Sequence, residues 1–277
     1  MKQNLKFYLK SKLTEKELRI VPSSFDVVGD ILIFSEFPKE LAKKEKIIGQ
    51  TILENYHHIK TILKKTKKYS GKFRTPKLKV IAGEKRKETI CRENNVFIKL
   101  DVEKVYFSPR MSSERKRIAE LINPNESVLI MFSGSGVYPI VIAKSTRCKE
   151  VYGIEINPVA HKYASENVKK NKFENRINLF LGDVRKIMPK INKKFDRILM
   201  PLPKGGEHFL DLSIKYAKKH GIVHFYDFLH EDEFYKAREK IQNACKKSKY
   251  KCKILRIVKC GQYSPRFYRI CADFIVD

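Results

Sequence analysis

The sequence predicts an α/β protein whose main domain is a parallel sheet with helices between its strands, preceded by a smaller α+β domain. Three observations lead to this fold class. Short apolar runs alternate with helical segments from Pro109 onward, the last two runs are joined by a turn too short for a helix, and the residues before Pro109 lack this alternation. Hydrophobic residues make up 42% of the 277 residues, which provides for a buried core and excludes a disordered polycation.

The first domain is expected over residues 20–107, after a short charged N-terminal extension over residues 1–19. Asp26–Phe34 predicts two strands paired around a Gly-Asp turn. A long helix is predicted after Pro38, because apolar residues from Leu41 to Leu63 recur at helical spacing. Two further strands are predicted, over Leu78–Ala82 and Val96–Val102.

The second domain is expected over residues 108–277. Five apolar strands separated by helices are predicted at 127–132, 151–156, 177–181, 195–200 and 222–228. A helix over Glu231–Lys247 leads to a last pair of strands, Lys253–Val258 and Phe267–Val276, which should be antiparallel. Seven strands that end in such a hairpin are typical of the class I methyltransferase variant of the Rossmann architecture.

The overall charge points to the class of partner. The 59 Lys+Arg and 31 Asp+Glu give a net charge of +28, and an extended polyanion would relieve the self-repulsion that this excess causes. We therefore expect RNA or DNA, while a lysine-rich surface adapted to high temperature is the alternative. Clusters that can follow phosphates lie at Lys64–Lys68, Lys85–Lys87, Arg115–Arg117 and Lys246–Lys253.

Neither a membrane nor a metal partner is expected. No apolar run reaches the ~18 residues of a membrane span, and Met1–Arg19 lacks the apolar centre of a signal peptide, so we expect a cytoplasmic protein. The six cysteines form no C-x-x-C motif and no cluster with histidine. We therefore expect neither a disulfide framework nor a metal site.

A candidate nucleoside-binding loop follows the first strand of the second domain. It contains Phe132, Gly134 and Gly136, where glycines let the backbone approach a ligand. Glu155 ends the next strand and can accept hydrogen bonds from both hydroxyls of a ribose. Dinucleotide enzymes use the same geometry, but Pro139 stands where their third glycine falls, which favours a cofactor without a pyrophosphate.

The adenine ring is expected at the end of the third strand. Asp183 can accept a hydrogen bond from the adenine amino group, with Ile156 or Val184 packing on the ring. The alternative is that Asp183 only caps the helix that follows it.

Several motifs resemble the archaeal and eukaryotic tRNA (guanine-37-N1)-methyltransferase family and its relatives in wyosine synthesis. The similar segments cover about residues 20–277 and include TPKLKVIAGEKRKETIC, MFSGSGVYPI, YGIEINP, GDVRKI, RILMPLP and GIVHFYDF. FSPR-x-S-x-ER is the most specific of them. The resemblance implies S-adenosylmethionine as cofactor, the anticodon loop of tRNA as partner with position 37 as target, and an enzyme that we expect to be a monomer.

The resemblance also implies roles for individual residues. Glu114 matches the proposed general base, which guanine needs because its ring nitrogen 1 is protonated at neutral pH, and Arg115 is its catalytic neighbour. Arg74 matches an arginine suited to oxygen 6 of guanine or to the flanking phosphate, and Arg110 can reach the cofactor carboxylate. For Glu114 and Arg115 the alternative is a pair of solvated surface charges, and for Arg110 it is a structural ion pair.

Two aromatic residues open the FSPR segment. Tyr106 and Phe107 can stack on a base that is flipped out of the anticodon loop, or they can be core aromatics.

Two residues depart from the family pattern. Ile130 replaces an acidic residue at the end of the first strand, so the cofactor contact there must come from the backbone. Pro201 replaces the asparagine of Asn-Leu-Pro, which leaves Pro201 and Pro203 beside the target base and gives room for a larger one. An archaeal subgroup that shares the HFYDF-x-HE run methylates both guanosine and 4-demethylwyosine, and we expect this chain to do the same.

Two alternative functions stay open. One is transfer of the aminocarboxypropyl group of the same cofactor in wyosine synthesis, although the intact FSPR motif argues against it. The other is a non-catalytic tRNA-binding protein, for which Ile130 is the best argument. Family members often carry a further N-terminal docking domain, and only about 20 residues precede the region of resemblance.

Overall fold

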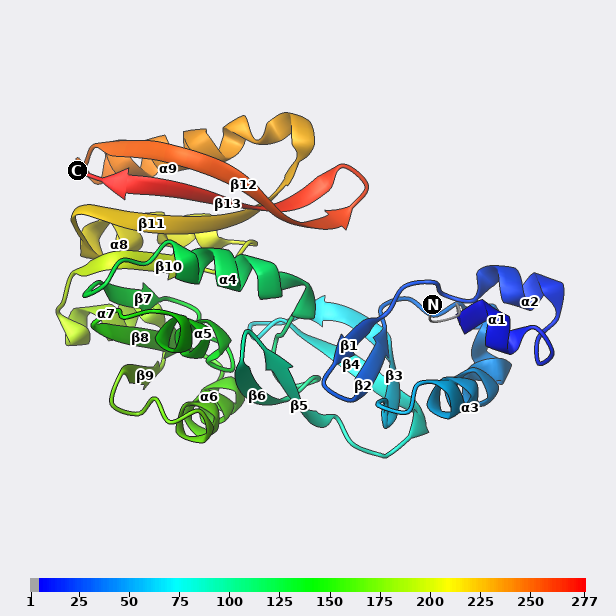
Figure 1. Ribbon diagram of the computed structural model, residues 1–277. Coiled ribbons are helices and arrows are strands. Elements are labelled where there is room, and N and C mark those ends of the chain that lie inside the picture. Colours follow the sequence, from blue (N-terminus) through cyan, green and yellow to red (C-terminus); the bar gives the residue numbers. More distant parts are fainter. Residues whose placement is uncertain (1–4) are drawn as a thin grey trace. The chain divides into compact units, whose positions relative to one another are not determined.

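The computed structural model describes residues 5–277, except for the side chains of Lys68 and Tyr69. The chain forms two compact units (Figure 1), and each is described by itself. The first unit contains the residues up to Arg92 and Phe97–Pro109, and the second contains Glu93–Val96 and Arg110–Asp277.

The first unit is built on a four-stranded sheet in the order β1-β2-β3-β4. Its strands are β1 (Asp26–Val28), β2 (Ile31–Phe34), β3 (Thr61–Ser70) and β4 (Thr75–Gly83). The predicted hairpin over Asp26–Phe34 is confirmed, because β1 and β2 pair antiparallel. A separate two-stranded sheet holds β5 (Glu88–Glu93) and β6 (Val96–Asp101).

The long helix predicted after Pro38 is wrong in its second half. A 3-10 turn (η1, Lys39–Lys44) leads into α3 (Glu45–Asn55), and the residues up to Leu63 do not continue the helix. Thr61 and Leu63 instead belong to β3, where they pair in parallel with β2 and antiparallel with β4. Pairing between distant strands outweighs the local helical spacing here.

The N-terminal segment also differs from the expected short extension. It forms α1 (Leu5–Leu9) and α2 (Glu15–Ile20). Leu5, Leu9 and Leu13 are buried in one apolar cluster with Leu41 and Ile48. The many lysines of the segment hide this apolar spacing in the sequence, and residues 5–20 belong to the first unit.

The second unit confirms the predicted seven-stranded sheet, with the order β12-β13-β11-β10-β7-β8-β9. β13 runs antiparallel to both β11 and β12, while the neighbouring pairs from β11 to β9 are parallel. The strands are β7 (Ser127–Ile130), β8 (Glu150–Glu155), β9 (Ile177–Leu181), β10 (Phe195–Met200), β11 (Ala217–His230), β12 (Cys252–Ser264) and β13 (Phe267–Val276).

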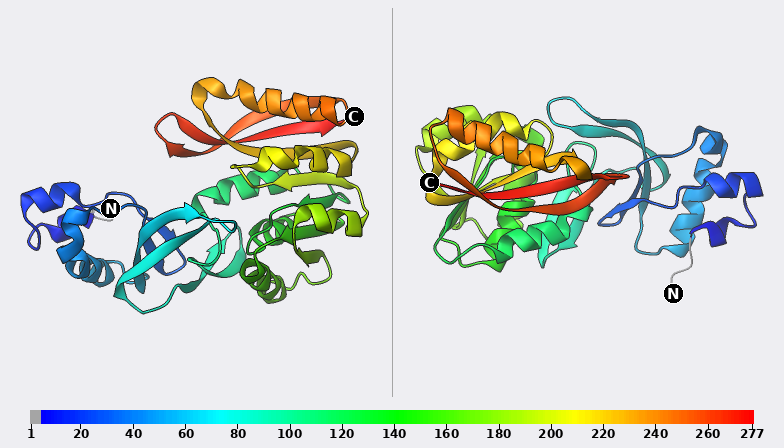
Figure 2. Two further views of the ribbon diagram at one scale, coloured as in Figure 1. Left: turned by 180° about the vertical axis from the view of Figure 1, so that it is seen from behind. Right: turned by 90° about the horizontal axis from the view of Figure 1, so that it is seen from above.

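Helices cover both faces of this sheet, as Figures 1 and 2 show from opposite sides. One face carries α4 (Ser112–Glu120), α5 (Val137–Ser145) and α6 (Pro158–Lys170). The other carries α7 (Val184–Ile191), α8 (Leu210–Tyr216) and α9 (Tyr235–Lys247), which share one apolar core with the strands. Three 3-10 turns complete the unit: η2 (Pro109–Met111), η3 (Gly206–Phe209) and η4 (Glu231–Glu233).

One expectation about the cysteines is wrong. Cys245, in the last turn of α9, forms a disulfide with Cys252, the first residue of β12. The turn between the helix and the strand brings the two Cα atoms to 6.2 Å, a proximity that sequence spacing alone does not reveal. Within residues 5–277, no helix is long and apolar enough to cross a membrane.

Candidate active site

The loop between β7 and α5 is shaped by two glycines. Gly134 and Gly136 have φ angles of 56° and 81°, in the left-handed region that favours glycine. A Cβ atom at Gly136 would lie 3.1 Å from the Cβ atom of Ala164 on α6, so a larger residue would push the loop away from that helix. The loop therefore keeps its backbone at the carboxyl end of the parallel strands, where open α/β sheets bind ligands.

Glu155 faces this loop from the end of β8. Its Oε2 atom accepts a hydrogen bond from the Gly134 N–H at 2.7 Å, and its Oε1 atom accepts one from the Asn157 N–H at 2.8 Å. Burial raises the pKa of Glu155, and these backbone donors counter that rise. Each carboxylate oxygen has a second lone pair, so the side chain can still accept two hydroxyl donors from a ribose.

Two serines in the same loop were missed by the sequence analysis. The hydroxyl groups of Ser133 and Ser135 are buried and have no hydrogen-bond partner among the described residues. The loop backbone is fixed independently, because the Ser133 N–H bonds to the Ile154 carbonyl and the Ser135 carbonyl accepts from Asn167. The two serine hydroxyl groups can therefore form hydrogen bonds with a bound nucleoside or an ordered water. In the sequence, the only signal for this role is the position of the two serines beside the glycines.

Asp183 caps the helix that follows it. It is the N-cap of α7, and its Oδ1 atom accepts from the Arg185 N–H at 2.8 Å. The cap uses one carboxylate oxygen, so contact of the other with adenine stays a prediction. Of the two residues expected on the ring, Val184 is only 4% exposed and lies in the core, whereas Ile156 is partly exposed.

An aromatic pair borders the loop. The ring of Phe132 meets that of Phe209 edge to face at a centroid distance of 5.0 Å. The guanidinium group of Arg185 lies 3.9 Å from the centre of the Phe209 ring. These contacts fix the orientation of Phe132 beside the loop.

The FSPR-x-S-x-ER motif leads into α4, and the charges of its Glu-Arg pair are buried. Glu114 and Arg115 are 5% and 3% exposed, which excludes the alternative of surface charges. Arg115 makes two parallel hydrogen bonds of 2.5 Å to Glu93. It also lies 5.8 Å from the centre of the Tyr138 ring. Glu93 therefore holds this guanidinium group in place, and a catalytic role of Arg115 stays a prediction.

Glu114 accepts hydrogen bonds from two side chains. Both of its oxygens accept from Arg117, at 2.7 Å each, and Oε1 also accepts from the Tyr226 hydroxyl at 2.7 Å. The Tyr138 hydroxyl lies 3.1 Å from that of Tyr226. Burial raises the pKa of both tyrosines, which keeps them protonated and able to donate. The carboxylate proposed as the general base is thus held in one orientation.

Arg117 joins Glu114 to a second buried carboxylate, Asp273 on β13. Asp273 bonds to Arg117 at 2.9 Å, to His224 at 2.6 Å and to Arg256 at 2.8 Å. Although burial raises the pKa of Asp273, its bonds to His224 and Arg117 outweigh that effect and hold the pKa far below its usual range. We call Glu114, Arg117, His224 and Asp273 the buried ion network.

Arg197 contacts the buried ion network at His224. This residue is 1% exposed, pairs with Glu126, and lies 2.9 Å from the Nε2 atom of His224. Burial lowers the pKa of His224, so a neutral ring donates from Nδ1 to Asp273 and accepts at Nε2 from Arg197.

The same region contains a group of potential metal ligands. Ligand atoms of His224, Cys271 and Asp273 lie within 4.8 Å of one another. Arg117 and Arg256 bond directly to Asp273, and Arg197 bonds to His224. Three positive charges in contact with these groups disfavour a cation, so the arrangement fits an ion-pair network.

The two prolines expected beside the target base follow β10 and differ in burial. Pro201 is partly exposed, in agreement with a place at the rim of a substrate site. Pro203 is buried, and its role in substrate binding stays a prediction.

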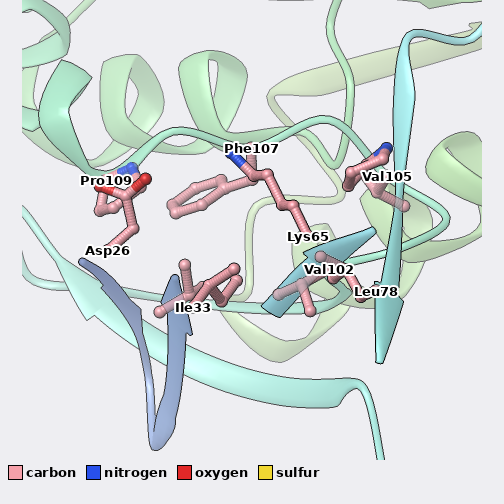
Figure 3. Close-up of a pocket in the computed structure, with 10 residues that line it drawn as sticks. Asp26, Ile33, Lys65, Leu78, Val102, Val105, Phe107 and Pro109 are labelled. Carbon is pink, nitrogen blue, oxygen red and sulfur yellow. The ribbon is translucent and has the colours of Figure 1, made fainter. Parts of the chain in front are cut away.

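Three predicted site residues belong to the first unit, and Arg110 belongs to the second. Arg74 lies in the turn between β3 and β4 with a φ of 50°, and Tyr106 is 37% exposed. Phe107 lines a pocket of the first unit together with Ile33 and Lys65, and Figure 3 shows its ring over Ile33. Phe107 is partly exposed, whereas Tyr106 and Arg110 are exposed, and the predicted contacts of all three with a ligand stay predictions.

Comparisons with known proteins cover both units. A family model described as the TRM5/TYW2 methyltransferase domain matches residues 89–255, and one described as the TYW2 N-terminal domain matches residues 5–86. The tRNA (guanine(37)-N(1))-methyltransferase Trm5b of Pyrococcus abyssi is 41% identical over 262 residues, which are 94% of this chain and 76% of that protein.

Two further relatives extend the comparison. The tRNA (guanine(37)-N(1))/4-demethylwyosine(37)-methyltransferase Taw22 of Nanoarchaeum equitans is 35% identical, over 89% of this chain and 97% of that protein. The solved complex of aTrm5 and tRNALeu superposes with a TM-score of 0.87 at 31% identity, over 100% of this chain and 79% of that one.

Proposed function

Because the chain belongs to the TRM5/TYW2 methyltransferase family, we propose that it transfers a methyl group from S-adenosylmethionine to ring nitrogen 1 of guanosine at tRNA position 37. The observation that carries this proposal is the combination, within one unit, of the Gly134–Glu155 cradle with a buried Glu114 on the FSPR helix. A cradle alone would suit many nucleoside ligands. A buried, oriented carboxylate adds the group that guanine chemistry requires.

The residues of the cradle fit S-adenosylmethionine. Glu155 would hold the ribose hydroxyls, Ile156 and Asp183 the adenine, and Gly134 and Gly136 would allow the backbone to come close. Phe132 would border the site, and Arg110 would bind the cofactor carboxylate. When bound, the cofactor supplies a methyl group on a positively charged sulfur. No phosphate has to be accommodated, which agrees with Pro139 in the first turn of α5.

Glu114 is proposed to accept the proton of ring nitrogen 1. Its carboxylate already accepts three hydrogen bonds, two of them from Arg117. Oε1 accepts two of these bonds and Oε2 accepts only the one from Arg117, so the second lone pair of Oε2 would receive the proton, while the bond of Arg117 to Asp273 would hold the arginine in place. Arg74 would stabilise the negative charge that develops on oxygen 6.

Methylation of 4-demethylwyosine at the same position is a second proposed activity. Pro201 is partly exposed and offers no side-chain amide, so this position presents no polar side-chain group that a tricyclic base would leave unpaired. The similarity to Taw22 along almost its whole length supports the same view. The first unit is proposed to bind RNA, in keeping with the basic strands β3 and β4.

One experiment tests both activities. The protein is incubated with unmodified tRNA, and separately with tRNA that carries 4-demethylwyosine, using S-adenosylmethionine labelled either on the methyl group or on the aminocarboxypropyl chain. Mass analysis of the nucleosides then identifies the group transferred and the base that receives it. Methyl label on guanosine-37 supports the proposal, whereas aminocarboxypropyl label would replace it with the alternative transferase. Failure of the protein to bind the cofactor in calorimetry would leave only a tRNA-binding protein.

A further inference from the structure

The end of the three-stranded ribbon β11–β13–β12 projects past the rest of the sheet. Met200, the last residue of β10, pairs with Phe225, yet β11 continues to His230. This extension pairs with the start of β13, which in turn pairs with the end of β12. Figure 1 shows the β12–β13 hairpin, in orange and red, extending beyond the other strands of the second unit. The ribbon end thus rises from the edge of the sheet that also holds the cofactor loop.

One face of the ribbon end carries aromatic rings and a cation in contact. The rings of Phe228 and Tyr263 have centroids 4.7 Å apart. The guanidinium group of Arg269 lies 5.1 Å from the centre of the Phe228 ring, and Phe228 and Arg269 are direct partners across the two strands. Tyr263 is 70% exposed, the most open of the large hydrophobic residues in the described chain. The exposed Tyr263 ring packs on Phe228, which Arg269 contacts in turn, so little entropy is lost when a flat ligand stacks on Tyr263.

This aromatic face is continuous with the proposed reaction site. Phe228 lies two positions after Tyr226 on β11, so their side chains point to the same side of the sheet. Tyr226 donates a hydrogen bond to Glu114 at 2.7 Å. The stacking surface therefore lies on the same side of the sheet as the carboxylate that would take the proton of the target base.

The charge of the molecule favours a nucleic acid on this surface over another protein. The net charge is +28, and the face itself joins aromatic rings to an arginine. Single-stranded nucleic acids are bound by this combination, in which bases stack on aromatic side chains and cations follow the backbone. Position 37 lies in an unpaired loop, and removal of its base from the stack exposes the faces of its neighbours.

We propose that Tyr263, Phe228 and Arg269 form a stacking site for one unpaired base of the tRNA loop that flanks the methylated position. This inference rests on the proposed function, because that function supplies the loop. The site holds the neighbouring base after the target base has left the stack, and so fixes the register of the loop against Glu114.

The test compares three variants of the full chain, Tyr263→Ala, Tyr263→Phe and Tyr235→Ala. Tyr235 is the matched control, because it is a tyrosine of the same unit that is 53% exposed. The dissociation constant of unmodified tRNA is measured at one fixed salt concentration, and that of S-adenosylmethionine is measured by calorimetry to show that each variant is folded. Transcripts with 2-aminopurine at the positions flanking 37 report stacking by the quenching of their fluorescence.

Tyr263→Ala is expected to weaken tRNA binding by about 5- to 150-fold, the range for loss of one base–aromatic stack, and to abolish the quenching at one flanking position. Tyr263→Phe keeps the ring, so it should retain both the tRNA affinity and the quenching of the wild type. Tyr235→Ala should retain both as well. The affinity for S-adenosylmethionine should be unchanged in all three variants. Equal tRNA affinity for Tyr263→Ala and the wild type would overturn the proposal, and so would a loss in Tyr263→Phe as large as in Tyr263→Ala. A change of oligomeric state in Tyr263→Ala without a change in tRNA affinity would assign the surface to protein contact. These readouts are of binding, so a wild type that binds tRNA but does not methylate it would refute the proposed function and leave this test intact.

Discussion

The cofactor cradle and the buried ion network occupy the same unit but are built in opposite ways. The cradle consists of backbone groups and a single partly exposed carboxylate, Glu155, and all of its parts lie within the first two βα units. The buried ion network consists of charged side chains from α4 and β13 and a neutral histidine from β11, and its Arg117–Asp273 bond spans 156 positions in the sequence. The cradle needs local turns, whereas the network needs the whole sheet to be assembled. Removal of a side-chain group from the cofactor cradle should therefore weaken ligand binding. Removal of one from the buried ion network should lower the stability of the fold or the rate of the reaction.

The largest effect is expected when the buried ion network loses Asp273. The Asp273→Asn variant removes a charge that is 1% exposed as a side chain and that bonds to Arg117, His224 and Arg256. Breaking a buried ion pair in this way costs about 3–5 kcal/mol, because the remaining charges stay buried without a counter-charge. Urea unfolding should show this loss in the free energy of unfolding. The control variant is Glu174→Gln, whose free energy of unfolding should hardly change because Glu174 is exposed. Equal stability of the two variants would mean that the network contributes nothing to folding.

The next effect concerns chemistry within the same network. Glu114→Gln keeps the size of the side chain but cannot take a proton, so single-turnover methylation of guanosine should fall by about 100-fold or more while tRNA binding stays near normal. Glu120→Gln is the control, because Glu120 lies on the same helix and its side chain is 64% exposed. A glutamine variant as active as the wild type would show that Glu114 serves only the structure.

A smaller effect is expected in the cradle, and it should appear in binding and not in stability. Glu155→Ala removes the acceptor for the ribose hydroxyls and should cost about 1.5–3 kcal/mol of binding free energy for S-adenosylmethionine. Calorimetry on the folded variant measures this change in binding free energy. Glu174→Ala is the control variant and should bind S-adenosylmethionine as the wild type does. Unchanged affinity would remove Glu155 from the cofactor site.

The smallest effect on the main reaction is expected at the rim. Pro201→Asn adds an amide that can hold guanine, so methylation of guanosine-37 should survive within about tenfold. Methylation of 4-demethylwyosine should fall further, because an unmatched buried amide costs about 1–3 kcal/mol. Rates on the two tRNAs, measured side by side, give the ratio. If the wild type methylates guanosine but not 4-demethylwyosine, the second activity is refuted before the variant is made.

The parts of the molecule that the sequence predicted well are those that local patterns encode. Alternation of apolar runs and helices predicted the parallel strands of the second unit, and the short turn before Phe267 predicted the antiparallel hairpin, both of which are confirmed. The glycines of the loop and Glu155 at a strand end were predicted together, and the structure joins Gly134 to Glu155 by a hydrogen bond. The partners of Glu114 were not predicted, although Glu114 itself was. Arg117 is one turn away along α4, but nothing local distinguishes it from the other basic residues of that helix.

What the sequence determined by itself is the order of strands and helices in the second unit, the place of the candidate nucleoside-binding loop and the polyanionic class of the partner. These follow from periodicity, turn residues and net charge, which act over a few residues or over the whole chain. Only the tertiary structure decided that Thr61–Ser70 is a strand, that Leu5 and Leu9 enter a core, and that Cys245 meets Cys252. It also decided which charges are buried together, since Asp273, His224 and Arg117 meet only after β13 has paired with β11 and α4 has packed on the sheet. The physical reason is that burial and pairing of charged groups depend on neighbours distant in sequence, and a linear pattern does not record them.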